Sequence, residues 1–256
     1  MSKIPYTRNT PNARQRTEVP ADPNQPVTDG VTEHPLMEDP DALALRLVES
    51  EDFVRRNKTA LLSLLAVVVL AVVGGFAFYT WRNTQNEKGQ AAMYQAVNYW
   101  EADSLNKALK GDGQYDGLAT ITSEYNGTQA ANLANFYAGV AALKDGKYQN
   151  AIDYLEDFTS DDLLVQARAY SLIGDAYLEL NKFKEAADQY EKAANYKSNE
   201  YFSPGYLMKE ATARELAKDY EGAIKAYTRI VDEYQNAAEV TEAKQYLARV
   251  QALAGK

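Results

Sequence analysis

The chain has 256 residues, with 27 Lys and Arg against 36 Asp and Glu, and a net charge of −9. This acidic balance excludes the basic stripe that nucleic-acid binding requires. The sequence has no cysteine and a single histidine, His34. Thiolate chemistry, histidine-assisted nucleophiles and histidine-based zinc sites are therefore excluded, and we expect a binding protein without a cofactor rather than an enzyme.

Residues 1–39 are predicted to form a disordered cytoplasmic tail. Seven of the eight prolines lie within the first 40 residues, and the rest of this segment is too polar to build a core. Residues 40–58 are predicted to form a juxtamembrane amphipathic helix, and a solvated helix continuous with the next segment is the alternative. Apolar residues share one face of this helix, namely Leu43, Leu47, Val48 and Val54.

Residues 59–81 are predicted to form a transmembrane helix. Residues 59–79 carry no charge, and at about 1.5 Å per residue they cover about 30 Å, the thickness of the hydrocarbon layer of a bilayer. Tyr79 and Trp81 stand where aromatic residues anchor a helix at the membrane interface. The segment before the run is much longer than that of a cleaved signal peptide, so an uncleaved signal anchor is favoured.

The cations that flank the apolar run predict its orientation. Arg46, Arg55, Arg56 and Lys58 precede it, whereas Arg82 and Lys88 follow it. Because positive charge is retained on the cytoplasmic side, the N-terminus is expected in the cytoplasm and the C-terminal domain across the membrane. In a bacterium this predicts a single-pass protein of the inner membrane with a periplasmic domain.

Beyond Trp81 the sequence favours a continuation of the same helix. Helix-forming residues extend to about residue 110 and are interrupted only by Gly89. One side of this continuation is apolar and is expected to pack on the first repeat, through Met93, Val97 and Trp100. The helix is expected to end at Gly111, and a flexible joint at Gly89 is the competing interpretation.

Residues 82–256 are predicted to form an array of helical hairpins. Residues 168–193 read RAYSLIGDAYLELNKFKEAADQYEKA, which resembles the tetratricopeptide repeat (TPR) pattern. The matching positions are Tyr170, Ile173, Gly174, Tyr177, Ala186 and Tyr190. Gly174 and Ala186 are small because two antiparallel helices are expected to cross closely there.

Neighbouring copies are expected because one hairpin cannot bury its own apolar face. A copy 35 residues earlier contains Gly139, Tyr148, Ala151 and Leu155. A degenerate copy downstream contains Ala211, Tyr220, Ala223 and Tyr227, a half-match lies at residues 115–125, and a capping helix is expected after residue 238. The predicted fold class is therefore all-α, with a disordered tail, one transmembrane helix and a TPR-type solenoid.

The resemblance to TPR proteins implies a partner-binding groove along one face of the first helix of each hairpin. Carried over position by position, its residues are Phe136, Val140, Leu143, Arg168, Ser171, Asp175, Leu178, Met208, Thr212 and Glu215. This mixed apolar and acidic set differs from the lysines and asparagines that clamp a chaperone's C-terminal carboxylates. The alternative is that Phe136 and Val140 pack against the preceding helix.

The order of tail, single span, emerging helix and repeats is similar to the single-span ancillary subunit of the bacterial Sec translocon. That resemblance implies an adaptor near the translocon whose partners are translocon subunits, exported polypeptides or periplasmic chaperones. A homo-oligomeric scaffold for envelope-complex assembly is the alternative function, in which a neighbouring copy fills the groove.

Overall fold

The computed structural model describes residue 48 and residues 50–255. The chain divides into two units, Met1–Val67 and Val68–Lys256. The regular elements of the described part are α-helices, so the predicted all-α class is confirmed. The predicted disordered tail, residues 1–39, and the first part of the predicted juxtamembrane helix lie outside the described residues. Residues 51–56 are helical and Asn57 is a turn residue.

Helix α2 (Lys58–Glu101) runs for 44 residues and contains the whole predicted transmembrane segment. By length and composition it could cross a membrane, since its most apolar window has a mean hydropathy of 2.7 and is not buried in the protein. It passes through Gly89 without a break, which confirms the continuous helix and argues against a joint there. Met93 and Ala96 on its outer part are buried in the core.

Helix α2 ends ten residues before the predicted break at Gly111, so that prediction was wrong. Asp103 takes a left-handed conformation with φ of 54°. The amide of Ser104 then donates to the carbonyl of Tyr99 at 2.8 Å, and the amide of Asp103 donates to Trp100 at 3.0 Å. This pair of backward hydrogen bonds satisfies the last carbonyls of the helix and turns the chain.

The same turn ends the first helix of every hairpin: α2, α5 (Gln129–Lys144), α7 (Leu163–Glu179) and α9 (Ser203–Leu216). Its left-handed residues are Asp103, Gly146, Asn181 and Lys218. In each case the next amide donates back into the helix, at 2.8–2.9 Å. The second helices begin two residues after the left-handed residue and are α3 (Leu105–Lys110), α6 (Tyr148–Glu156), α8 (Phe183–Asn195) and α10 (Tyr220–Glu233).

The hairpin of α2 and α3 is a repeat that the sequence did not reveal. Like the other hairpins, it has one buried small residue seven positions before the left-handed residue and another five positions after it. The first position holds Ala96, Gly139, Gly174 and Ala211 in the four hairpins, and the second holds Ala108, Ala151, Ala186 and Ala223. Its turn lies 43 residues before the next, whereas the later turns are 35 and 37 residues apart. The extra length is a loop at residues 111–117, which separates α3 from α4 (Leu118–Glu124). The half-match at residues 115–125 is thus the second piece of an interrupted helix.

The inserted loop is ordered around Asp112. Its Oδ1 accepts hydrogen bonds from the amides of Gln114 and Tyr115 at 2.9 and 2.8 Å, and its Oδ2 accepts one from the hydroxyl of Tyr99 at 2.6 Å. These bonds, that of Tyr99 foremost, lower the pKa of Asp112 to about 2. The carboxylate therefore stays ionised, and its contribution to stability is present at neutral pH and lost only as the pH falls towards about 2.

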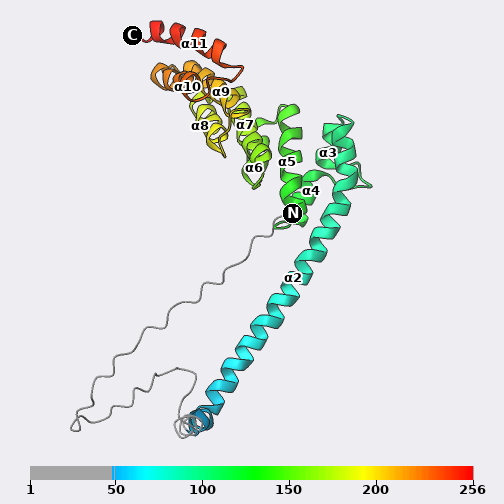
Figure 1. The fold of residues 1–256 in the computed structure, drawn as a ribbon. Coiled ribbons are helices and arrows are strands. Elements are labelled where there is room, and N and C mark those ends of the chain that lie inside the picture. Colours follow the sequence, from blue (N-terminus) through cyan, green and yellow to red (C-terminus); the bar gives the residue numbers. More distant parts are fainter. Residues whose placement is uncertain (1–47, 49, 256) are drawn as a thin grey trace, which may run out of the picture. The chain divides into compact units, whose positions relative to one another are not determined.

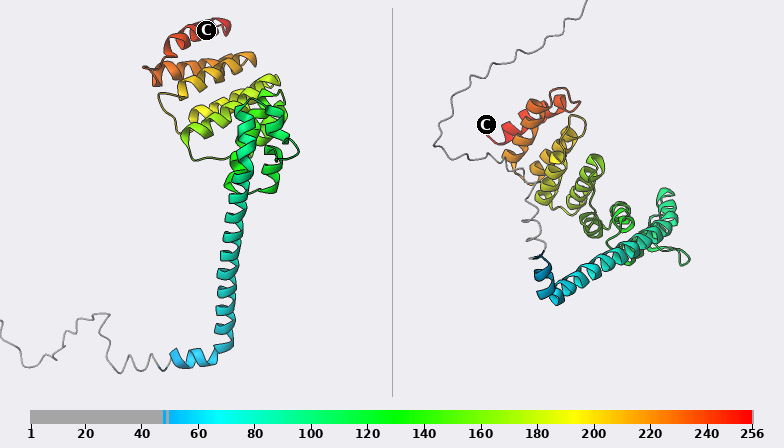
Figure 2. Two further views of the ribbon diagram at one scale, coloured as in Figure 1. Left: turned by 90° about the vertical axis from the view of Figure 1, so that its right-hand side faces the viewer. Right: turned by 60° about the horizontal axis from the view of Figure 1, so that its bottom comes forward.

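The hairpins pack on one another in chain order. Helix α6 lies beside α7, α8 beside α9 and α10 beside α11 (Val240–Leu253), as Figure 1 shows. Figure 2 shows the stack from two further sides, with α11 at its C-terminal end, where the capping helix was predicted. Among the largest fully buried side chains are Tyr190 and Tyr227, which come from the second helices.

The crossing of α7 and α8 leaves no room for a side chain at Gly174. A Cβ atom there would lie 2.7 Å from the ring of Tyr190, which is only 2% exposed. At Gly139 a Cβ would lie 2.5 Å from Leu155, so the preceding hairpin has the same restriction. The small residues of the repeat pattern are therefore required by backbone approach.

We predict that Gly174→Ala lowers the free energy of unfolding by about 1 kcal/mol. The added methyl group overpacks the crossing, which costs about 1–3 kcal/mol, whereas the higher helix propensity of alanine stabilises α7 by about 1 kcal/mol. Gly205→Ala is the matched control, because its Cβ would meet only Glu239 Oε1, at 3.6 Å. Urea unfolding monitored by circular dichroism measures both, and equal stability of the two variants would contradict the close crossing.

Candidate functional site

The predicted groove residues differ widely in their access to solvent. Arg168 and Thr212 are exposed, and Ser171 is completely buried, with 0% exposure. The others are half-buried: Phe136, Val140, Leu143, Asp175, Leu178, Met208 and Glu215. Only part of the predicted set is therefore free to contact a partner directly.

The three predicted residues on α5 pack within the protein. The ring of Phe136 lies 5.1 Å from that of Phe158, which follows α6 and is buried. Val140 and Leu143 pack against the same core cluster. The sequence-based alternative, that Phe136 is a packing residue, therefore describes this part of the face, although its aromatic contact lies after α6 rather than on the preceding helix.

Asp175 on α7 is held by two neighbouring helices. Its Oδ1 lies 2.7 Å from Nζ of Lys209 on α9 and accepts a hydrogen bond of 2.7 Å from the hydroxyl of Tyr190 on α8. Ser171 Oγ lies 3.3 Å from the same Lys209 ammonium. The assignment of Ser171 to the binding surface was wrong, because Ser171 is fully buried and its hydroxyl accepts a hydrogen bond from Lys209.

Glu215 on α9 is bound in the same manner. The guanidinium of Arg249 on α11 donates to both carboxylate oxygens, at 2.8 and 2.7 Å, and the hydroxyl of Tyr227 donates to Oε1 at 2.7 Å. Burial, together with the adjacent carboxylate, raises the pKa values of both Tyr190 and Tyr227, so the hydroxyls remain donors.

We call these two triads the inter-hairpin clamps: Tyr190–Asp175–Lys209 and Tyr227–Glu215–Arg249. In each, a tyrosine of a second helix and a cation of the following helix meet on one carboxylate. The clamps neutralise the acidic positions that the sequence placed in the groove. Sequence reasoning missed Lys209 and Arg249, whose pairing depends on how successive hairpins stack.

A double-mutant cycle with Asp175→Ala and Lys209→Ala measures the first clamp. We expect a coupling free energy of about 1 kcal/mol, because the pair is partly exposed but shares a tyrosine hydrogen bond. The cycle with Asp103→Ala and Lys144→Ala is the control, since those side chains are 75% and 50% exposed. Its coupling should be near zero, and a control as strong as the clamp would contradict a special role for Asp175.

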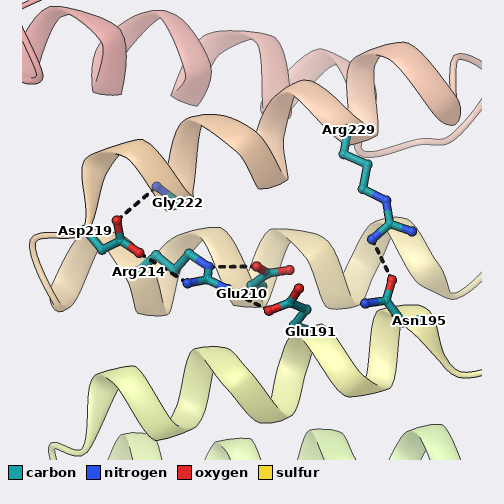
Figure 3. Close-up of polar contacts among 7 residues, drawn as sticks. All are labelled: Glu191, Asn195, Glu210, Arg214, Asp219, Gly222 and Arg229. Carbon is teal, nitrogen blue, oxygen red and sulfur yellow. Dashed lines mark hydrogen bonds and ion pairs between the residues drawn. The ribbon is translucent and has the colours of Figure 1, made fainter.

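A second polar network is centred on Arg214 and is shown in Figure 3. Its guanidinium donates to Glu210 at 2.7 Å, to Glu191 of α8 at 2.8 Å and to Asp219 of the α9–α10 turn at 3.2 Å. The side chains of Arg214 and Glu210 are 18% and 7% exposed. Burial raises the pKa of Glu210, and the hydrogen bond from Arg214 opposes that rise. Arg214 thus compensates a buried carboxylate while it connects three segments.

We predict that Arg214→Met lowers the free energy of unfolding by about 3 kcal/mol at neutral pH, because Glu210 is left buried and unpaired. A group whose pKa is raised on folding favours the folded state below its unfolded pKa, and this benefit is lost as the pH rises through the folded pKa. The loss in Arg214→Met should therefore shrink towards pH 4.

Chemical unfolding at pH 7 and pH 4 checks this prediction. Lys144→Met is the control, since its ion-pair partner Asp103 is 75% exposed and the loss should stay below about 1 kcal/mol. A loss in Arg214→Met that is the same at both pH values would show that Glu210 does not depend on this cation.

Comparison with known proteins supports the repeat assignment. The tetratricopeptide repeat family model matches residues 136–201 and again residues 171–238. The two matches start 35 residues apart, which is the distance between the turns at Gly146 and Asn181. A search of curated proteins found no match. Residues 136–238 therefore contain tetratricopeptide repeats, which indicate a scaffold for protein–protein interactions.

Proposed function

We propose that this chain is a membrane-anchored scaffold that binds protein or peptide partners on the extracytoplasmic side and catalyses no reaction. One observation carries the proposal: α2 is at once the long apolar helix and the first helix of the repeat array. An array joined in this way to a membrane helix would be held beside the bilayer.

The apolar part of α2 favours a lipid environment. Its large side chains are uncovered, for example Leu70 at 71%, Val72 at 66% and Phe76 at 69% exposure. A continuous apolar surface of this kind is rare on a protein in water. The cations before the run support a cytoplasmic N-terminus, and hence a repeat domain in the periplasm of a bacterial inner-membrane protein.

The partner surface we propose is the exposed part of the predicted groove face. Arg168 of α7 and Thr212 of α9 are its exposed predicted residues. We add Leu133 of α5 and Leu216 of α9, which are 44% and 49% exposed. Because the clamps neutralise Asp175 and Glu215, this face suits an apolar or weakly charged polypeptide better than a strongly basic one. The partners we propose are exported polypeptides and their chaperones near the Sec translocon, as the resemblance to the ancillary subunit suggests.

Site-specific photo-crosslinking in intact cells tests the proposal. We expect a photoreactive residue at Arg168 or Thr212 to capture translocon subunits, exported polypeptides or periplasmic chaperones. The control position is Lys184, which is also exposed but lies on the second helix α8. Equal capture at Lys184 would contradict a binding role for the groove face.

Two further outcomes are informative in the same cells. Crosslinks between copies of the chain alone would favour the alternative function, a homo-oligomeric scaffold for envelope assembly. Protease added to spheroplasts should digest the repeat domain, and a protected domain would contradict the assigned side of the membrane.

A further inference from the structure

We propose that a hollow between α2, the α4–α5 turn and the end of α6 binds the headgroup of a zwitterionic aminophospholipid. The phosphate would pair with Arg82 and the primary ammonium with Asp157. This inference rests on the membrane anchor of the proposed function, but it does not depend on the protein partner.

The repeat domain begins at the level where the apolar run ends. Arg82 lies three residues beyond Tyr79, and its guanidinium donates to the carbonyl of Gly127 in the α4–α5 turn. Asn86, one turn further on, accepts a hydrogen bond of 2.9 Å from the amide of Ala130 at the start of α5. At 1.5 Å per residue these contacts lie about 5 and 10 Å past the run, which is the depth of the lipid headgroups.

The contact between α2 and α5 is close enough to define this level. A Cβ at Gly89 would lie 2.9 Å from the Cβ of Ala130 and 3.1 Å from the ring of Tyr125. Met93, the next residue on the same side, is 5% exposed within the core. The α4–α5 turn is therefore fixed against α2 by packing as well as by the hydrogen bonds of Arg82 and Asn86.

The hollow beside this contact has a volume of about 620 Å³, within the range of small-molecule sites. Its wall is largely polar. The lining residues that carry the argument are Arg82, Asn126, Gln129, Asn135, Tyr154 and Asp157. The side-chain amides of Asn126, Gln129 and Asn135 make no hydrogen bond to another described residue, so they are available to a ligand.

The charges of the hollow are complementary to a zwitterion. Arg82 and Asp157 both line it, and within the described residues neither forms an ion pair. Arg82 uses a single donor nitrogen on Gly127, which leaves other N–H groups of its planar guanidinium for a phosphate. Asp157 is an acceptor-only carboxylate, which a primary ammonium with three N–H donors satisfies.

The pair of Arg82 and Asp157 is expected to discriminate among phospholipid headgroups. A choline headgroup has the same net charge as ethanolamine but no N–H to donate to Asp157. A glycerol headgroup has the phosphate but no cation, so the Asp157 carboxylate would face a net negative ligand. Ethanolamine is therefore expected to bind best, because it alone of the three satisfies both charges.

Native mass spectrometry of the full-length chain tests this. The protein, purified in detergent, is incubated with an equimolar mixture of phosphatidylethanolamine, phosphatidylcholine and phosphatidylglycerol with identical acyl chains. We expect about tenfold preferential retention of phosphatidylethanolamine over phosphatidylcholine, the size of one charged hydrogen bond. Asp157→Asn should abolish this preference, and Arg82→Gln should lower retention of all three lipids.

Matched controls separate the hollow from general charge effects. Glu156→Gln removes the carboxylate next to Asp157, and Lys88→Gln removes an exposed cation of α2 outside the hollow, so both should retain the native preference. Equal retention of ethanolamine and choline lipids by the native chain would overturn the inference. Preferential retention of phosphatidylglycerol would overturn it as well, because it would indicate a site for an anion alone.

Alkaline extraction of membranes from cells that produce the native chain separates this inference from the proposed function. If alkaline carbonate releases the native chain from the membrane, the proposed membrane anchor is contradicted. If the chain stays in the membrane but shows no lipid preference, only the proposed headgroup site is contradicted. Arg82 and Asp157 are exposed, so their variants should keep the native helix content in circular dichroism, which excludes unfolding as the cause.

Discussion

The close crossing of two helices within each hairpin is the constraint on which the rest of the structure depends. Gly139 and Gly174 have no room for a Cβ, and the same left-handed turn seven residues later begins the return helix. This geometry buries the tyrosine or leucine of the second helix and leaves one edge of the hairpin apolar. Each hairpin must then pack on the next, and the array of α3 to α11 follows from that requirement. Helix α2 joins the array through Met93 and Ala96 in the core.

Because α2 supplies the first helix of the array, the apolar run and the repeats share one element. Gly89, Met93 and Ala96 pack into the core only a few turns after the run ends. No linker separates the two parts, so a membrane around the run would have the α4–α5 turn at its surface. The proposed binding function and the proposed headgroup site both depend on this continuity, although they involve different residues.

Several acidic side chains of this domain are held in ion pairs within the protein. Asp175 and Glu215 are bound in the inter-hairpin clamps, and Glu210 is compensated by Arg214. Each carboxylate is partly or fully removed from water and is therefore paired with a cation. The net charge of the chain is −9, yet its predicted binding face offers few free carboxylates. A partner would meet leucine and arginine side chains there rather than an acidic surface.

The amino-acid sequence alone determined the hairpins at residues 136–238 and the long apolar helix, because small residues at a fixed period and an uncharged run are local signals. It could not show the hairpin of α2 and α3, since the loop at residues 111–117 shifts its period to 43 residues. Nor could it show that Ser171 is buried or that Lys209 and Arg249 neutralise the groove. Those facts depend on contacts between helices about 35 residues apart, and only the stacking of successive hairpins decides which side chains meet.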